Sequence, residues 1–364
     1  MRKIKQWISY VTAVFIFVLV AAGSVTAAET KKLVVHYLNV GQGDATLVTV
    51  GEHAMLIDAG GNDDVEPVLN YIQNKQGLNR LEYVIGTHPH EDHIGAMDAV
   101  IDAVEVENVL LPDVTTNSQT FEDVLDAIGR NTPYLITPEV GETYKLGDAS
   151  FTILGPAETY DDSDLNNWSI ALKITYYDTS FIFTGDAEET AEQDIINTGL
   201  DLTADVYQVG HHGSDTSSSE SFIRAVVPSY AVISCGSNND YGHPNQSVLD
   251  RLNEFGIQIF RTDIQGTITA TSDGNNISWS EEPTSDFIGG DADSVNNEVT
   301  TSAIEETQPS TDIASTAVMV HITNTGEKYH SAGCQYLRSS DIEVTLEGAK
   351  SRGLTPCSKC NPPQ

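Results

Sequence analysis

The stretch Thr87-His-Pro-His-Glu-Asp-His-Ile-Gly95 carries three histidines and an aspartate within six residues. It follows an apolar run, Leu81 to Gly86, that is typical of a β-strand, and it precedes a pattern typical of a helix. The side chains that this tight turn would bring together are His88, His90, Asp92 and His93. Neutral imidazoles and carboxylates at this spacing suit two neighbouring zinc or manganese ions, which can clamp an in-line displacement at phosphorus or a carbonyl. The stretch therefore predicts a metal site.

Three later segments each end an apolar strand on a residue that can bind metal. Phe181-Ile-Phe-Thr-Gly-Asp186 ends on a carboxylate that, paired with the first turn, is expected to bridge two ions. Val206-Tyr-Gln-Val-Gly-His211-His212-Gly-Ser214 ends on two histidines. These point to opposite sides of an extended chain, so one can bind metal while the other contacts substrate or a carboxylate. Tyr241-Gly-His243-Pro244 supplies a further histidine, and Asp58 is better placed to orient a ligand histidine than to bind metal itself.

Residues 33–280 alternate short apolar strands with amphipathic stretches. The predicted helices are Val65–Lys75, Ile94–Ala103, Phe121–Gly129, Glu188–Thr198, Glu220–Val226 and Ser247–Phe255. Tight turns join several of the strands, and helices separate the others. This order predicts an α/β domain in which two sheets pack face to face and helices cover their outer sides.

The first residues have the pattern of a secretory signal peptide. Three basic residues within the first five precede an apolar stretch from Ile8 to Ala22, and small residues follow it up to Ala28. This pattern predicts residues 1–27 as a cleaved signal peptide and the protein as secreted. An uncleaved membrane anchor is the alternative, because the apolar stretch is only slightly shorter than a membrane span.

The remaining chain is strongly acidic. Three of the 18 Lys and Arg residues precede residue 28, so 15 basic residues face 53 acidic ones and the net charge is −38. Such an excess suits a soluble protein outside the cell. It opposes passive binding of nucleic acid, because most of the surface repels phosphate. Any phosphate ester must therefore be attracted by the metal ions themselves, and the charge slightly favours a small ester.

The C-terminal part differs in composition. Residues 281–315 contain nine acidic residues and no Lys or Arg, which predicts a flexible acidic linker. Beyond it, residues 317–364 carry four soft ligands in two clips, His330-x3-Cys334 and Cys357-x2-Cys360, separated by 22 residues. This spacing predicts a closed tetrahedral site for one structural zinc, without which so short a module would hardly fold. A disulfide with free thiols is the alternative in an oxidising environment.

The metal-binding motifs, in this order, resemble the metallo-β-lactamase superfamily. Two more, Asn39-Val-Gly-Gln-Gly-Asp44 and Asn166-Asn-Trp-Ser169, resemble the extracellular hydrolase domain of ComEC-type DNA-uptake proteins and their secreted relatives. The resemblance covers residues 33–280 and implies an αββα sandwich with two metal ions at one edge of the sheets. The tail resembles small zinc modules appended to secreted relatives. Because the superfamily includes ribonucleases, phosphodiesterases, glyoxalases and lactamases, the fold does not choose a substrate.

The resemblance also implies a role for each motif residue. The implied ligands are His88 and His90 for the first ion, Asp92, His93 and His243 for the second, and Asp186 as the bridge. One of His211 and His212 would bind metal or take part in catalysis, and which one stays open. Asn166-Asn167 stands where many members of the superfamily have a further histidine. The first ion therefore needs His211 or water to complete its ligands.

The sequence thus predicts a secreted metal-dependent hydrolase with Asp92, His211 and His212 as catalytic residues. Two ions would polarise the ester and activate a water, and His211 or His212 would protonate the leaving group. The expected substrate is a phosphodiester, either DNA or a small or cell-wall ester. A monomer is expected, with a zinc module that contacts the cell wall. The alternatives are a lactamase or lactonase, which acts on a carbonyl, and a non-catalytic cell-wall binding protein.

Overall fold

The computed structural model describes residues 31–291 and several segments of the C-terminal part, namely 319–323, 328–332, 334–337, 342–351, 354–360 and 362–363. The chain divides after Thr301 into two compact units. The predicted signal peptide, residues 1–27, and residues 292–315 of the predicted linker lie outside the described residues. None of the helices in the described segments is long and apolar enough to cross a membrane.

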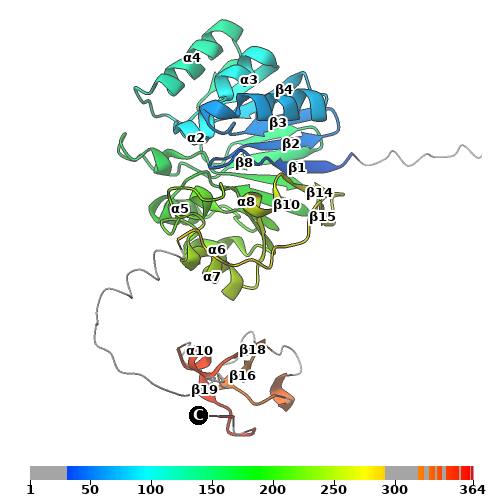
Figure 1. Ribbon diagram of the computed structural model, residues 1–364, viewed down its shortest axis with the longest axis vertical. Coiled ribbons are helices and arrows are strands. Elements are labelled where there is room, and N and C mark those ends of the chain that lie inside the picture. Colours follow the sequence, from blue (N-terminus) through cyan, green and yellow to red (C-terminus); the bar gives the residue numbers. More distant parts are fainter. Residues whose placement is uncertain are drawn as a thin grey trace, which may run out of the picture. The chain divides into compact units, whose positions relative to one another are not determined.

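Two sheets form the centre of the first unit (Figure 1). The strands of the first sheet are β1 (Leu33–Tyr37), β2 (Thr46–Val50), β3 (His53–Ile57), β4 (Arg80–Ile85), β5 (Glu105–Leu110), β6 (Tyr134–Ile136), β14 (Ile268–Ser272) and β15 (Ile277–Trp279). Those of the second are β7 (Thr143–Leu146), β8 (Ala149–Ile153), β9 (Leu172–Tyr176), β10 (Thr179–Phe183), β11 (Val206–Gln208), β12 (Tyr230–Ile233) and β13 (Gln258–Arg261). The spatial orders are β15-β14-β1-β2-β3-β4-β5-β6 and β13-β12-β11-β10-β9-β8-β7.

Helices cover the outer face of each sheet, which completes the predicted αββα sandwich (Figure 1). The helices on the first sheet are α1 (Val65–Leu69), α2 (Glu91–Ile94), α3 (Met97–Ala103) and α4 (Gln119–Asn131). Those on the second are α5 (Glu189–Asn197), α6 (Glu220–Val226) and α7 (Gln246–Glu254). Shorter helical segments are η1 (Asn62–Asp64), η2 (Asn70–Lys75), η3 (Leu165–Trp168), η4 (Gly210–Gly213) and α8 (Thr262–Gln265).

All six predicted helices are present, but two of them are divided, and residues 65–75 form α1 followed directly by η2. Residues 94–103, predicted as one helix, are divided between α2 and α3. The Gly95 N–H donates to the carbonyl of Gly60 (2.8 Å) instead of to a helical carbonyl. A Cβ on Gly95 would lie 2.2 Å from the carbonyl carbon of Gly61, so only glycine allows the two segments to approach this closely.

The main core lies between the two sheets. Tyr37 of β1 stacks on Phe183 of β10, with ring centroids 6.3 Å apart, and Phe260 of β13 stacks on Trp279 of β15 at 4.0 Å. Two further apolar clusters lie beneath the helices, one on each outer face. A central strand such as β3 is therefore buried on both faces, which explains its unbroken apolar run of residues 54–57.

Polar residues follow several strands at the point where each strand ends. β3 and β4 are parallel in the first sheet, and β10, β11 and β12 are parallel in the second. The residues that follow these strands are Asp58, Thr87, Asp186, His211 and Ser234. Because the carboxyl ends of parallel strands meet at one edge of a sheet, the fold gathers the predicted motif residues at one edge of the sandwich.

Residues 281–291 belong to the first unit and not to the linker that the composition predicts from residue 281. The carbonyl of Phe287 accepts a hydrogen bond from Gln246 Nε2 (2.9 Å), and the carbonyl of Ile288 accepts one from Arg261 Nη1 (2.8 Å). Phe287 also packs against the apolar cluster beneath α6 and α7. The predicted boundary is therefore too early, because its acidic composition concealed this apolar anchor.

The second unit is small. β16 (Met319–Ile322) pairs with β18 (Ile342–Thr345) antiparallel, and β17 (Lys328–Tyr329) pairs with β19 (Thr355–Pro356) parallel. The remaining elements are η5 (Gln335–Leu337) and α10 (Leu346–Ser351). Its apolar cluster among the described residues centres on Val320, Ile322, Tyr329 and Ala349. So small a core calls for additional stabilisation, such as a bound metal.

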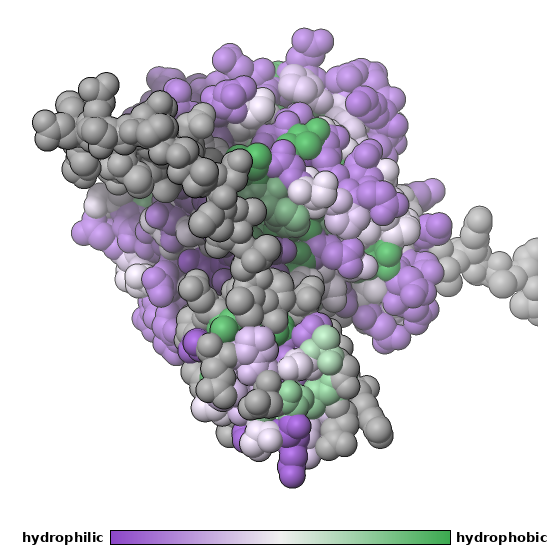
Figure 2. Space-filling view, turned by 60° about the horizontal axis from the view of Figure 1, so that its bottom comes forward, coloured by the Kyte–Doolittle hydropathy of each residue, from purple (hydrophilic) through white to green (hydrophobic). Residues whose placement is uncertain are grey.

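The surface agrees with the acidic composition. Figure 2 shows that hydrophilic residues dominate the visible surface of the described part of the chain, and that hydrophobic residues form only small groups there. This distribution is expected for a protein that carries 53 acidic and 18 basic residues.

Substitution of Phe181 in the core between the sheets should lower the free energy of unfolding of the first unit. Phe181 is fully buried, so Phe181→Ala is expected to cost about 3–5 kcal/mol. Tyr134 is 77% exposed, so Tyr134→Ala is the control and should change stability by no more than about 0.5 kcal/mol. Urea unfolding followed by the fluorescence of Trp168 and Trp279 would measure both. Equal stabilities would contradict the assigned core.

Candidate metal centre

The His-rich turn connects β4 to α2. His90 has extended backbone angles (φ −79°, ψ 150°) and immediately precedes the first residue of α2. The turn is fixed by Asp58, which follows β3 and accepts hydrogen bonds from the backbone N–H (2.8 Å) and the hydroxyl (2.8 Å) of Thr87. His88 and His93 are fully buried, whereas His90 is partly exposed. The imidazoles of this turn therefore extend from the protein interior, at His88 and His93, to a partly exposed position at His90.

One group of potential ligands comprises His88, His90 and Asp186. One ligand atom from each lies within 4.8 Å of the others. His88 Nε2 is 2.9 Å from His90 Nδ1 and 3.7 Å from Asp186 Oδ2. Burial, more than any other effect, lowers the pKa of His88 and of His90. Both side chains are therefore held neutral, which is the form that binds a metal.

A second group comprises Asp92, His93 and His212. His212 Nε2 lies 3.3 Å from Asp92 Oδ2 and 3.3 Å from His93 Nε2. Asp186 also reaches this group, because its Oδ1 is 3.2 Å from His93 Nε2 and 3.7 Å from His212 Nε2. The two carboxylate oxygens of Asp186 thus face different groups, as expected of a residue that bridges two ions.

The donors around Asp186 fit a pair of divalent cations. Asp186 Oδ1 is buried and, although it lies 3.2 Å from His93 Nε2, it makes no hydrogen bond of normal geometry to the described residues. Burial alone would raise the pKa of Asp186, but His93, His212 and His88 together hold it well below its usual range. Burial alone would lower the pKa of His93. The negative charges of Asp186 and Asp58 outweigh this effect and raise that pKa well above its usual value. A proton and a cation therefore compete for these nitrogens.

Neighbouring acceptors orient the ligand histidines. Asp58 Oδ2 lies 2.9 Å from His93 Nδ1, so Asp58 contacts a histidine that is predicted to be a ligand. The carbonyl of Ser234 accepts a hydrogen bond from His212 Nδ1 (3.0 Å). In each case the proton on Nδ1 leaves the Nε2 lone pair directed to the site. Asp58 has a left-handed backbone (φ 56°), which is a costly conformation for a non-glycine residue.

His211 and His212 do not lie in an extended strand, and this part of the prediction is wrong. Both have left-handed backbone angles, with φ values of 50° and 55°, within the turn η4 that follows β11. Gly213 continues the turn at φ 85°, and a Cβ there would lie 2.6 Å from Pro244. The tight turn still separates the two side chains. His212 enters the second ligand group, whereas His211 lies on the pocket wall.

The pocket in front of these groups has a volume of about 420 Å³. Its lining residues are Gln42, His90, Glu91, Asp92, Asn166, Asp186, His211, His212, Tyr241 and His243. None of these ten residues is a lysine or an arginine. An anionic substrate in this pocket would therefore depend on bound cations for electrostatic attraction.

His243 lies in the pocket but in neither ligand group. Its ring centroid is 5.6 Å from that of His211 and 6.3 Å from that of His212. Asn239 holds the residue in place, because it accepts from the His243 N–H (3.0 Å) and donates to its carbonyl (2.6 Å). Burial, with help from the neighbouring histidines, lowers the pKa of His243 to about 4. The place predicted for His243 beside Asp92 is taken by His212.

Sequence reasoning missed several polar residues around the site. Asp44 is buried with its Oδ1 3.6 Å from His212 Nδ1, and it forms a further potential ligand group with His212 and Asp186. Its only sequence signal is its place at the end of the motif of residues 39–44. Gln42 Nε2 lies 3.5 Å from His243 Nδ1, and Tyr241 stacks on the same ring at 5.7 Å. No spacing rule in the sequence identifies these contacts.

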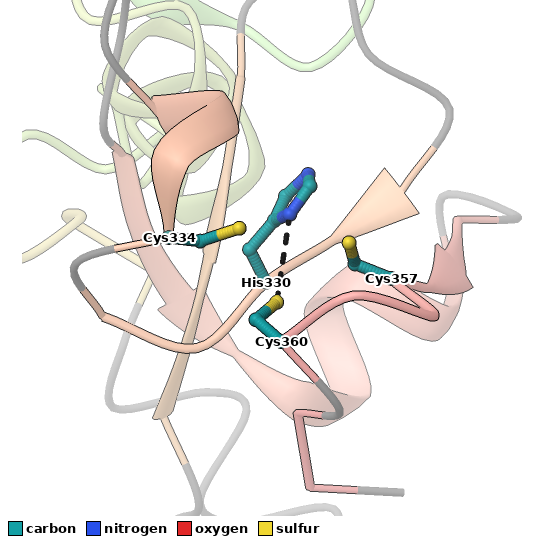
Figure 3. A group of neighbouring side chains, drawn as sticks. All are labelled: His330, Cys334, Cys357 and Cys360. Carbon is teal, nitrogen blue, oxygen red and sulfur yellow. Dashed lines mark hydrogen bonds between the residues drawn. The ribbon is translucent and has the colours of Figure 1, made fainter.

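The second unit contains its own candidate metal site. His330, Cys334, Cys357 and Cys360 each offer one ligand atom, and all four atoms lie within 4.8 Å of one another. Figure 3 shows the four side chains converging on one point, with His330 Nδ1 3.7 Å from Cys360 Sγ. Backbone N–H groups of Lys359 and Cys360 lower the pKa of the Cys357 thiol, which favours the thiolate that binds metal. The predicted four residues are thus brought together.

The chain matches the model of the Metallo-beta-lactamase superfamily over residues 38–237, and it belongs to that superfamily. Relatives among characterised proteins are competence proteins of the ComEC family. The chain is 33% identical to ComE operon protein 3 of Bacillus subtilis over 251 residues, which cover 64% of this chain and 32% of that protein. It is 28% identical to Competence protein ComA of Neisseria gonorrhoeae over 264 residues, which cover 69% of this chain and 34% of that protein. The chain thus spans about a third of the length of these relatives.

Two solved structures are similar to the chain at low sequence identity and with TM-scores below 0.5. YhfI of Bacillus subtilis, a metallo-beta-lactamase fold protein, is 12% identical with a TM-score of 0.45 and covers 68% of this chain and 100% of its own. CmlA, a diiron β-hydroxylase from Streptomyces venezuelae, is 16% identical with a TM-score of 0.46, and the match covers 66% of this chain and 54% of CmlA.

Loss of the Asp58 carboxylate should weaken metal binding in the first unit. Without it His93 loses the acceptor that fixes its ring, so Asp58→Asn is expected to lower the affinity for the core ions about 10–100-fold. Titration of metal-free protein with Zn²⁺ or Mn²⁺ would measure this. Asp63 is exposed in η1, and Asp63→Asn is the control with the same change of charge. Equal affinities for both variants would contradict the orienting role.

Loss of one cysteine should remove one metal ion from the chain. Cys357→Ser is expected to lower the zinc content from about three equivalents to about two, because a tetrahedral site needs all four ligands. Metal analysis after gel filtration would count the ions. Ser358→Ala, a change at the adjacent exposed residue, is the control and should retain all of them. Unchanged zinc content in Cys357→Ser would contradict a four-ligand site.

Proposed function

We propose that the protein is a secreted, metal-dependent phosphodiesterase. The observation that carries this proposal is that Asp186, which lines the pocket, belongs to one group of potential ligands and also lies within 3.7 Å of His93 and His212 of the other. Two cations held side by side in this way are suited to hydrolysis at phosphorus. Similarity to a protein named as a competence protein, together with the motifs that resemble ComEC-type DNA-uptake proteins, supports a phosphodiester as the substrate class.

Each residue of the site would have a separate role in the proposed reaction. His88, His90 and Asp186 would hold one ion, and Asp92, His93, His212 and Asp186 the other. Bound zinc or manganese would polarise the ester and activate a water. His211 and His243 line the same pocket without belonging to either group, so they are available to bind the ester or to donate a proton to its leaving group.

The sequence supports further parts of this proposal. The pattern of residues 1–27 supports export, and the net charge of −38 after their removal supports a small or wall-bound ester over free DNA. The C-terminal cluster would hold one structural zinc and stabilise a module that contacts the cell wall. We expect the protein to be a monomer.

Substrate assays on metal-loaded protein would test the proposed reaction. Bis-p-nitrophenyl phosphate, single-stranded and double-stranded DNA, and a chromogenic β-lactam form a suitable panel. We expect turnover of the phosphodiester, its loss in His212→Ala together with one core ion, and a smaller loss in His243→Ala, which should retain both ions. Turnover of the β-lactam alone would indicate a carbonyl hydrolase. No turnover of any ester by a fully loaded chain would indicate a binding protein.

A further inference from the structure

Glu188 is a polar residue of the site that the proposed reaction does not yet use. It immediately precedes α5 and lies two residues after Asp186, and its side chain is 30% exposed. Glu188 Oε1 accepts hydrogen bonds from Thr216 Oγ1 (3.1 Å) and from Asn166 Nδ2 (3.4 Å). The same oxygen is 3.6 Å from His211 Nδ1. One carboxylate oxygen of Glu188 thus lies within 3.6 Å of the side chains of Thr216, Asn166 and His211.

These contacts fix where the proton on His211 lies. A carboxylate only accepts, so the hydroxyl of Thr216 donates to Glu188 and can accept from His211 Nδ1, which is 3.1 Å away. With the proton on Nδ1, the lone pair of Nε2 is free. His211 Nε2 is 3.7 Å from Asp186 Oδ2, the oxygen that faces the first ligand group. The chain of hydrogen bonds therefore directs a metal-binding nitrogen to that group.

Asn166 and Asn167 hold this chain of hydrogen bonds in place. Asn167 Oδ1 accepts the backbone N–H of Glu188 (3.0 Å), while Asn166 donates to its side chain. Asn166 Oδ1 is buried without a hydrogen-bond partner among the described residues, and Asn166 lines the pocket. The two asparagines thus hold Glu188 in place beside the imidazole of His211.

We propose that Glu188 and Thr216 are positioning residues that hold His211 as a ligand of the first ion. This proposal rests on the metal centre of the proposed function. It assigns His211 a ligand role and leaves His243 as the free imidazole in the pocket. The second ion, which His212 binds, should be insensitive to the loss of either positioning residue.

Co²⁺ titration of the metal-free full chain would test the proposal without substrate. Thiolate ligands give Co²⁺ a strong charge-transfer band that nitrogen and oxygen ligands do not give, so the C-terminal cluster and the core can be followed separately. Thr216→Val removes the hydroxyl at nearly constant volume, and Thr216→Ser restores it. We expect Thr216→Val and Glu188→Ala to lower the affinity of one of the two core steps about 10–100-fold. The other core step should be unchanged.

The controls separate positioning from a general effect on the fold. Thr216→Ser should bind both core ions like the unmodified chain. Glu189→Ala removes the adjacent, exposed carboxylate and should also leave both steps unchanged. Equal core affinities in Thr216→Val and the unmodified chain would overturn the positioning role, as would an equal loss in Glu189→Ala. A failure of the unmodified chain to bind Co²⁺ in the core would instead overturn the metal centre, and this proposal with it.

Discussion

The rest of the site depends on the buried negative charge of Asp186, which nearby positive charge must compensate. Its two oxygens lie within 3.7 Å of ring nitrogens of His88, His93, His211 and His212. An ionised carboxylate removed from water costs several kcal/mol unless positive charge compensates it. Protons on the imidazoles and divalent cations can both supply this charge, and only cations leave the ring nitrogens as ligands. The geometry therefore explains why carboxylates and histidines from four segments of the chain converge.

Convergence depends on both sheets. The His-rich turn and Asp58 follow strands of the first sheet, whereas Asp186 and His212 follow strands of the second. Packing between the sheets thus sets the distance between the two halves of the ligand set. The supporting acceptors are divided in the same way, since Asp58 orients His93 and the carbonyl of Ser234 orients His212. Each half carries its own orienting contact, and both Asp186 and His212 of the second half contact the His-rich turn of the first.

Much of this arrangement was predictable, because strand ends and metal ligands leave a local signal. The turn of residues 88–93, Asp186 and the histidines at 211–212 are each recognisable after an apolar strand. The choice between His212 and His243 was not predictable, since it depends on a left-handed turn that no residue pattern announces. Glu188 was missed for a similar reason, because its partners lie 22 and 28 residues away in sequence. The segment 281–291 was misread because acidic composition outweighed one partly buried phenylalanine, Phe287.

The left-handed backbone at His211 and His212 has a thermodynamic consequence. Each non-glycine residue in this conformation costs of order 1 kcal/mol. The folded chain carries this cost whether or not the two side chains bind an ion. An ion that binds only the folded form returns free energy through linkage. The turn is thus a small reservoir of strain that ion binding offsets. Heat resistance of the first unit should accordingly depend on the concentration of free cation, and glycine at these positions would relieve the backbone at the expense of the ligands.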